Sequence, residues 1–202
     1  MGYSQYRKLN QVTTKFALAD RRADLFGAIT PIEPSSWLTH SLAIAEEVAL
    51  NNEKVKSERI ISPILSEVHL MHKTKVALYS GEELNVSPEN DLNGPCDFFF
   101  SANPESYQLS APIVAFAEAK DEDMEWGIAQ CCAQMYAASL FNQANNRSIK
   151  SIFGCVTTGS EWRFIKLEDQ TIYIHSKAFY LDQVAILLGV FHQIINQIKQ
   201  IQ

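Results

Sequence analysis

The spacing of apolar residues changes along this chain of 202 residues, and that change restricts the possible folds more than any other feature. Residues 36–50 and 57–71 carry apolar side chains at helical spacing. Three short β-prone segments bounded by turn residues follow, at 75–80, 94–101 and 112–119. Since helices that precede consecutive strands cover a sheet, we expect an α/β fold.

The second half of the chain alternates in the same way. Residues 124–141 predict an alanine-rich helix, because one of its faces is continuously apolar. Residues 151–158 and 161–167 flank a Gly-Ser turn and predict a hairpin, to which 171–175 add an edge strand. The complete order predicts one domain in which helices flank a mixed central sheet.

The C-terminal segment 179–201 predicts a long amphipathic helix. Its apolar residues recur at alternating spacings of three and four. They are Leu181, Val184, Leu188, Phe191, Ile195 and Ile198. We favour a helix that packs on the sheet, and the alternative is a seam through which two copies of the chain form a homodimer.

The composition is that of an ordinary globular protein, with 47% hydrophobic and 20% charged residues. No apolar run reaches the roughly 18 residues that span a bilayer, and the first residues lack the apolar block of a secretion signal. We therefore expect a cytoplasmic protein without membrane contact. Four dispersed cysteines are expected to be buried thiols rather than disulfides or zinc ligands.

The charge is unevenly distributed along the chain. The formal net charge is −6, but residues 81–125 alone hold 11 acids and a single base, Lys120. Such a chain is not a general polyanion binder, because phosphate contacts need clustered Lys and Arg. An enzyme whose carboxylates hold a divalent cation that meets the phosphate remains compatible with this charge.

Acidic side chains interrupt two of the predicted strands at their ends. Asp97 comes directly before three phenylalanines, and Glu118 and Lys120 alternate with alanines at the end of the next strand. A strand has a period of two, so Glu118 and Lys120 share a face of the sheet. Charged groups there are costly to desolvate unless they are paired or bind a metal. The plainer interpretation is a Glu118–Lys120 ion pair, with Asp97 capping a turn.

This pattern resembles the signature of the PD-(D/E)XK nuclease superfamily, which has the restriction-endonuclease-like fold. Asp97 matches the first acid, with Gly94 three residues before it as in the G-x-x-D variant of the signature. Glu118-Ala119-Lys120 matches the (D/E)-x-K element. The resemblance implies that Asp97, Glu118 and the Ala119 carbonyl bind Mg²⁺, which Mn²⁺ can replace, and that Lys120 positions the attacking water.

Two further positions match the family pattern. Glu58, on the helix before the first strand, would reach the metal through water, and Gln130, on the helix after the third strand, would orient Lys120 or a phosphate. Gln134, one turn further along the same helix, is the second choice. Glu67 is a rival to Glu58 but is expected to face solvent.

The resemblance also implies an architecture. We expect a three-layer sandwich with the core order α-β-β-β-α-β. In this division, residues 1–52 form an N-terminal helical extension, 53–178 the nuclease-like core and 179–202 the C-terminal amphipathic helix.

Two functions follow from the sequence. The first is metal-dependent hydrolysis of a phosphodiester in nucleic acid, with DNA as the expected partner. The second is a catalytically weak or inactive member of the same fold that acts as a binding or assembly module. A zinc site on His69 and His72 is disfavoured, because no nearby Glu or Cys completes it.

Overall fold

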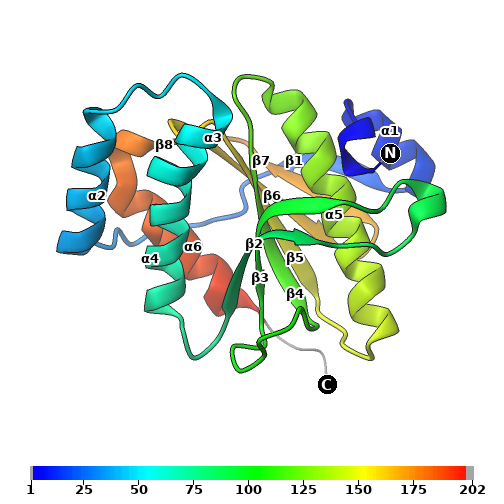
Figure 1. The fold of residues 1–202 in the computed structure, drawn as a ribbon. Coiled ribbons are helices and arrows are strands. Elements are labelled where there is room, and N and C mark those ends of the chain that lie inside the picture. Colours follow the sequence, from blue (N-terminus) through cyan, green and yellow to red (C-terminus); the bar gives the residue numbers. More distant parts are fainter. Residues whose placement is uncertain (1, 199–202) are drawn as a thin grey trace.

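The computed structural model describes residues 2–198 and contains one eight-stranded mixed sheet (Figure 1). The order along the sheet is β1-β7-β6-β5-β4-β3-β2, and β8 pairs with β6 beside this path. The strands are β1 (Ala19–Ala23), β2 (Ala77–Glu83), β3 (Pro95–Ser101), β4 (Ile113–Ala119), β5 (Ser151–Thr157), β6 (Glu161–Glu168), β7 (Thr171–His175) and β8 (Phe179–Tyr180).

Helices cover both faces of the sheet and give a three-layer arrangement (Figure 1). One core lies between the sheet and α2, α4 and α6, and a second lies between the sheet and α1 and α5. The α-helices are α1 (Leu9–Phe16), α2 (Ser36–Glu46), α3 (Glu53–Lys56), α4 (Ser62–Met71), α5 (Met124–Ala144) and α6 (Val184–Gln197). A π-helical turn, η2 (Ser57–Ile61), joins α3 to α4.

The central strands include both antiparallel and parallel neighbours, so the sheet is mixed. β2, β3 and β4 form an antiparallel meander, and α5 then carries the chain back so that β5 lies parallel to β4. This confirms the expected α/β class and the mixed sheet with flanking helices. Every residue of β4 is buried, which places the end of β4 beneath both helical layers.

Close packing fixes α5 on the sheet. A Cβ atom on Gly154 of β5 would lie 2.5 Å from Met135 Sδ and 2.7 Å from Cys131 Sγ. Only a glycine therefore lets this helix approach so closely. The four cysteines are free and buried, as expected.

The N-terminal segment is not only helical, so the expected helical extension over residues 1–52 is wrong in part. It includes β1, which pairs in parallel with β7 and is the outermost strand on that side. Residues 171–175 form a strand as expected, but they do not form the edge. Tyr3 and Tyr6 are buried in the core under α5, so the segment is part of the domain.

The C-terminal helix is shorter than predicted. Phe179 and Tyr180 pair with β6 instead of starting the helix, and α6 begins at Val184. Leu188, Phe191 and Ile195 are buried in the core that α6 shares with the sheet, which confirms packing on the sheet. Because these side chains are buried within one chain, they are not available for the homodimer seam that was the alternative. The end of the predicted segment, 199–202, lies outside the described residues.

Candidate active site

The acidic residues predicted on two strands lie side by side where those strands end. β3 and β4 pair Phe98 with Ala117, so the next position of this antiparallel register brings Asp97 beside Glu118. Asp97 Oδ2 accepts a hydrogen bond of 2.8 Å from the backbone N–H of Ala119. The Asp97 carboxylate therefore replaces a backbone carbonyl as the acceptor between the ends of β3 and β4.

Glu118 is fully buried and both of its oxygens are held. Lys120 Nζ lies 2.7 Å from Oε1, and Gln134 Nε2 donates to Oε2 over 2.8 Å. The expectation that Glu118 and Lys120 share a face is confirmed. A carboxylate offers about four lone-pair positions, so these two contacts leave Glu118 able to accept further ligands.

Lys120 is fixed by two neighbours in α5. Its aliphatic chain passes over Gly127, where an added Cβ would lie 2.8 Å from Lys120 Cγ. Its ammonium lies 5.4 Å from the centre of the Trp126 ring, a cation–π distance. The indole in turn donates to the Ser4 carbonyl over 3.2 Å, and Arg7 stacks on it. The N-terminal segment therefore helps to place this lysine.

The two acids hold their protons more strongly than ordinary carboxyls. Burial, and then the charge of Asp97, raise the pKa of Glu118 to about 8 against the lowering effect of Lys120. Burial also raises the pKa of Asp97. Burial alone would lower the pKa of Lys120, but the charge of Glu118 more than offsets this and the net shift is upward. One ammonium therefore does not stabilise both carboxylates in their ionised form, and a further cation would.

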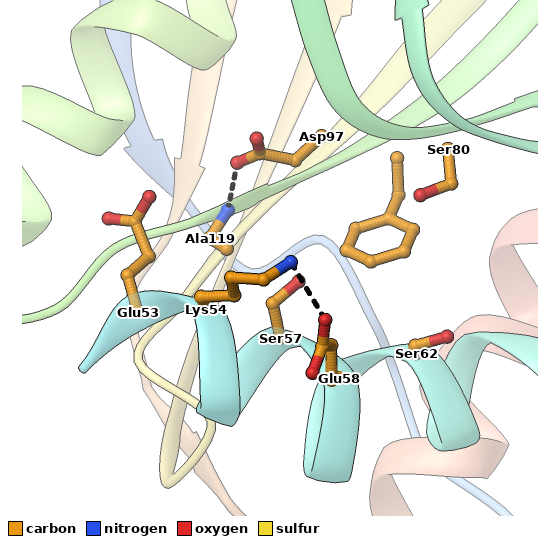
Figure 2. A pocket seen from close by; sticks show the side chains of 9 residues that line it. Glu53, Lys54, Ser57, Glu58, Ser62, Ser80, Asp97 and Ala119 are labelled. Carbon is orange, nitrogen blue, oxygen red and sulfur yellow. Dashed lines mark hydrogen bonds and ion pairs between the residues drawn. The ribbon is translucent and has the colours of Figure 1, made fainter. Parts of the chain in front are cut away.

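A cavity of about 320 Å³ opens between these strand ends and the segment α3–η2 (Figure 2). Asp97 and Ala119 line it from the sheet, and Glu58 lines it from the π-helical turn. Glu58 forms an ion pair of 2.8 Å with Lys54 on the same side of the cavity. The structure therefore brings Glu58 and Asp97 to one cavity, as the sequence analysis expects.

Gln130 is not part of this arrangement. It lines a separate cavity of about 300 Å³ with Tyr3 and Asn93, on the side of the N-terminal segment. The glutamine that contacts Glu118 is Gln134, which the sequence analysis ranks second. The prediction of Gln130 is therefore corrected to Gln134.

Glu67 is not exposed, so the expectation that it faces solvent is wrong. It is buried and accepts hydrogen bonds of 2.8 and 2.9 Å from the backbone N–H and hydroxyl of Ser35. Ser35 caps the first turn of α2, which gives Glu67 a structural role at that helix end. His72 is buried beside His192, with 4.9 Å between the two ring centres.

The residues at the strand ends fit a hard divalent cation. Such cations prefer carboxylate and carbonyl oxygens, and Asp97 and Glu118 supply two carboxylates at adjacent positions of neighbouring strands. In a strand, the N–H and C=O of one residue point the same way, so the Ala119 carbonyl faces the strand on which Asp97 lies. Within residues 2–198, no cluster of three or more His, Cys, Asp or Glu side chains is placed to bind a metal. The candidate site needs only two carboxylates and a carbonyl.

Comparison with known proteins does not identify a family for this chain. A scan against models of known protein families finds no match, and a search of curated proteins finds no related sequence. Within residues 2–198, no helix is long and apolar enough to cross a membrane.

Proposed function

We propose that this protein hydrolyses phosphodiester bonds in nucleic acid, with DNA as substrate, in a reaction that depends on Mg²⁺ or Mn²⁺. One observation carries the proposal. The half-buried Asp97 and the buried Glu118 lie side by side at neighbouring strand ends, and the one ammonium beside them, Lys120, pairs with Glu118. A structural ion pair needs one acid and one base, whereas this group holds two acids, so Glu118 keeps its proton near neutral pH unless a further cation binds.

The element order supports the resemblance to the PD-(D/E)XK superfamily. From α4 the chain runs through β2, β3, β4, α5 and β5, which is the core order α-β-β-β-α-β. The matching acids stand on β3 and β4, the second and third of these strands.

Each residue has a distinct task in this proposal. Asp97, Glu118 and the Ala119 carbonyl would hold the metal, which would stabilise the charge that develops on the scissile phosphate and acidify a water. Lys120 holds a proton at Nζ and orients the attacking water beside Glu118. Gln134 fixes the rotation of the Glu118 carboxylate. Glu58 faces the same cavity and would accept a hydrogen bond from a metal-bound water there.

The test is a plasmid-nicking assay with and without Mg²⁺ or Mn²⁺. We expect metal-dependent nicking that Glu118→Gln and Lys120→Ala each reduce by at least about 100-fold, because one weakens metal binding and the other removes the water-orienting amine. Nicking that survives both changes would refute the assignment of this site.

The chain offers a matched control for these variants. Lys166 and Glu168 form the same i, i+2 ion pair on one strand, at 2.8 Å, but at a partly exposed position. Lys166→Ala and Glu168→Gln should therefore leave nicking unchanged. They control for the loss of an acid–amine pair on a strand.

The second candidate function is a binding or assembly module with the same site in a weakened form. The excess of acidic residues in 81–125 favours it, because acids near the site repel a polyanion. Isothermal titration with Mn²⁺ separates the two. Mn²⁺ binding that is lost in Asp97→Asn, combined with no cleavage of any nucleic acid, would favour the module.

A further inference from the structure

Several side chains that line the cavity at the candidate site have no task in the proposed chemistry. Ser57 and Ser62 line it from the helical side, and Ser80 lines it from β2 (Figure 2). Phe98, whose side chain is almost fully buried, also lines the cavity. We refer to Ser57, Ser62, Ser80 and Phe98 as the serine arm.

The hydroxyls of the serine arm are free to meet a ligand. Serine and threonine side chains in helices often bond to a carbonyl about one turn earlier, as Thr39 and Ser139 do here. Figure 2 shows no hydrogen bond from the hydroxyls of Ser57, Ser62 or Ser80 to another residue that lines the cavity. Three such hydroxyls around one cavity provide donors for sugar and phosphodiester oxygens.

The size of the cavity limits what can enter. Its volume of about 320 Å³ is at the lower end of the range for small-ligand sites, which begins near 300 Å³. A duplex is far too wide for such a space, whereas one unstacked nucleotide is of the right order. Phe98 is only 5% exposed, so it offers this space a small apolar contact and no face on which a base could stack.

The charge around the cavity also disfavours a duplex. Both nearby lysines are already paired, Lys54 with Glu58 and Lys56 with Asp121. Glu53 adds a further acid to the lining. Duplex DNA carries about one charge per 1.7 Å of axis and a single strand about half of that, so the acidic rim repels a single strand less.

We propose that the serine arm receives one nucleotide of a single-stranded nucleic acid, so that the substrate class of this site is a single strand or an unpaired end. This inference rests on the proposed function. The serines donate to the sugar–phosphate oxygens of the nucleotide next to the scissile bond.

The experiment measures binding with the full chain, in Ca²⁺ so that cleavage does not interfere. Fluorescence anisotropy compares a fluorescein-labelled oligothymidylate of six nucleotides with a blunt duplex of 12 base pairs. We expect the single strand to bind at least about 10-fold more tightly. Equal or tighter binding of the duplex would overturn the proposal, and this comparison needs no variant protein.

A triple variant assigns the binding to the serine arm. Ser57→Ala combined with Ser62→Ala and Ser80→Ala should weaken binding of the single strand by about 10-fold, because each change removes one donor. Ser176→Ala removes an exposed hydroxyl elsewhere and serves as the control. Thermal melting verifies that the triple variant is folded. A folded variant with unchanged affinity would refute the serine arm as the binding site.

Cleavage assays on the same two substrates keep the two proposals distinct. If both are cut at equal rates, the inference fails and the proposed hydrolysis stands. If the single strand is bound selectively but neither substrate is cut with Mg²⁺ or Mn²⁺, the inference stands and the proposed hydrolysis fails.

Discussion

Replacing Glu118 by Gln should remove a specific part of the pH dependence of stability. The pKa of Glu118 is raised to about 8 in the folded protein from an ordinary value of 4.5, so between these values the folded state binds a proton that the unfolded state has released. Stability must then fall as the pH rises, by up to roughly 1.4 kcal/mol per pH unit for one proton.

Other groups set the window in which this effect can be measured. Burial lowers the pKa of His72 to about 4 from 6.5, so this histidine makes stability rise with pH between those values. His175 acts in the same direction. From about pH 7 upward both histidines are largely neutral in the folded and unfolded states, and Glu118 dominates. Between pH 6.5 and 7 the remaining protonation of the unfolded histidines is the same in the unmodified protein and in its Glu118 variant. Between pH 6.5 and 8 the contribution of Glu118 falls by between about 1 and 2 kcal/mol.

The assay is urea denaturation of the metal-free protein at pH 6.5, 7, 7.5 and 8. The free energy of unfolding of the unmodified protein should fall across the series, and that of Glu118→Gln should stay nearly level. Glu168→Gln is the control, because ion pairs lower the pKa of Glu168 and its titration lies below this window. Parallel curves for the unmodified protein and Glu118→Gln would refute the conclusion that this buried acid is protonated near neutral pH.

Adding Mg²⁺ extends the same measurement to the candidate metal site. A ligand that binds only the folded state stabilises it in proportion to the logarithm of its concentration above Kd. Because the ligands must be ionised, the gain from Mg²⁺ should increase from pH 6.5 to 8. Glu118→Gln should lose most of this gain. A gain that does not depend on pH or on Glu118 would place the metal elsewhere.

Three further predictions concern α5. Gly127→Ala should destabilise the fold by about 1–3 kcal/mol in urea denaturation, because the new Cβ would meet Val156 Cγ1 at 2.4 Å and must displace Lys120. Gln134→Leu should cost about 1–3 kcal/mol by leaving an oxygen of Glu118 unpaired, whereas Gln130→Leu should cost less than half of that; equal losses would contradict the assignment. Trp126→Leu removes the ring beside the ammonium and should shift the pH profile of nicking, and an unchanged profile would show that the indole does not position the lysine.

The sequence is sufficient to predict the parts of the site that depend on local geometry. Glu118 and Lys120 share a face because a strand has a period of two, and this holds in any sheet. Alternation with alanines indicates burial, and all of β4 is buried. The position of Asp97 depends on more than local geometry. Asp97 lies beside Glu118 only because β3 and β4 pair in an antiparallel register, which follows from their order as consecutive strands.

The N-terminal strand has no such local signal. Ala19–Ala23 reads Ala-Asp-Arg-Arg-Ala, without apolar alternation, because an outermost strand with mostly exposed side chains needs none. It pairs with β7, near the other end of the chain. Glu67 illustrates the same limit, since its burial depends on the distant Ser35 rather than on its own helix.

The choice between Gln130 and Gln134 depends on how α5 is rotated against β4, and one glycine determines that rotation. Gly127 must face Lys120, since any larger side chain would overlap it. At 100° per residue, position 134 lies seven residues on and within about 20° of the direction of Gly127, whereas position 130 is rotated by about 60°. Gln134 therefore reaches the carboxylate beside the lysine. The sequence does contain the residue that distinguishes Gln134 from Gln130, namely Gly127 in the first turn of the predicted helix. It decides between them only when Lys120 is known to pass beneath that turn.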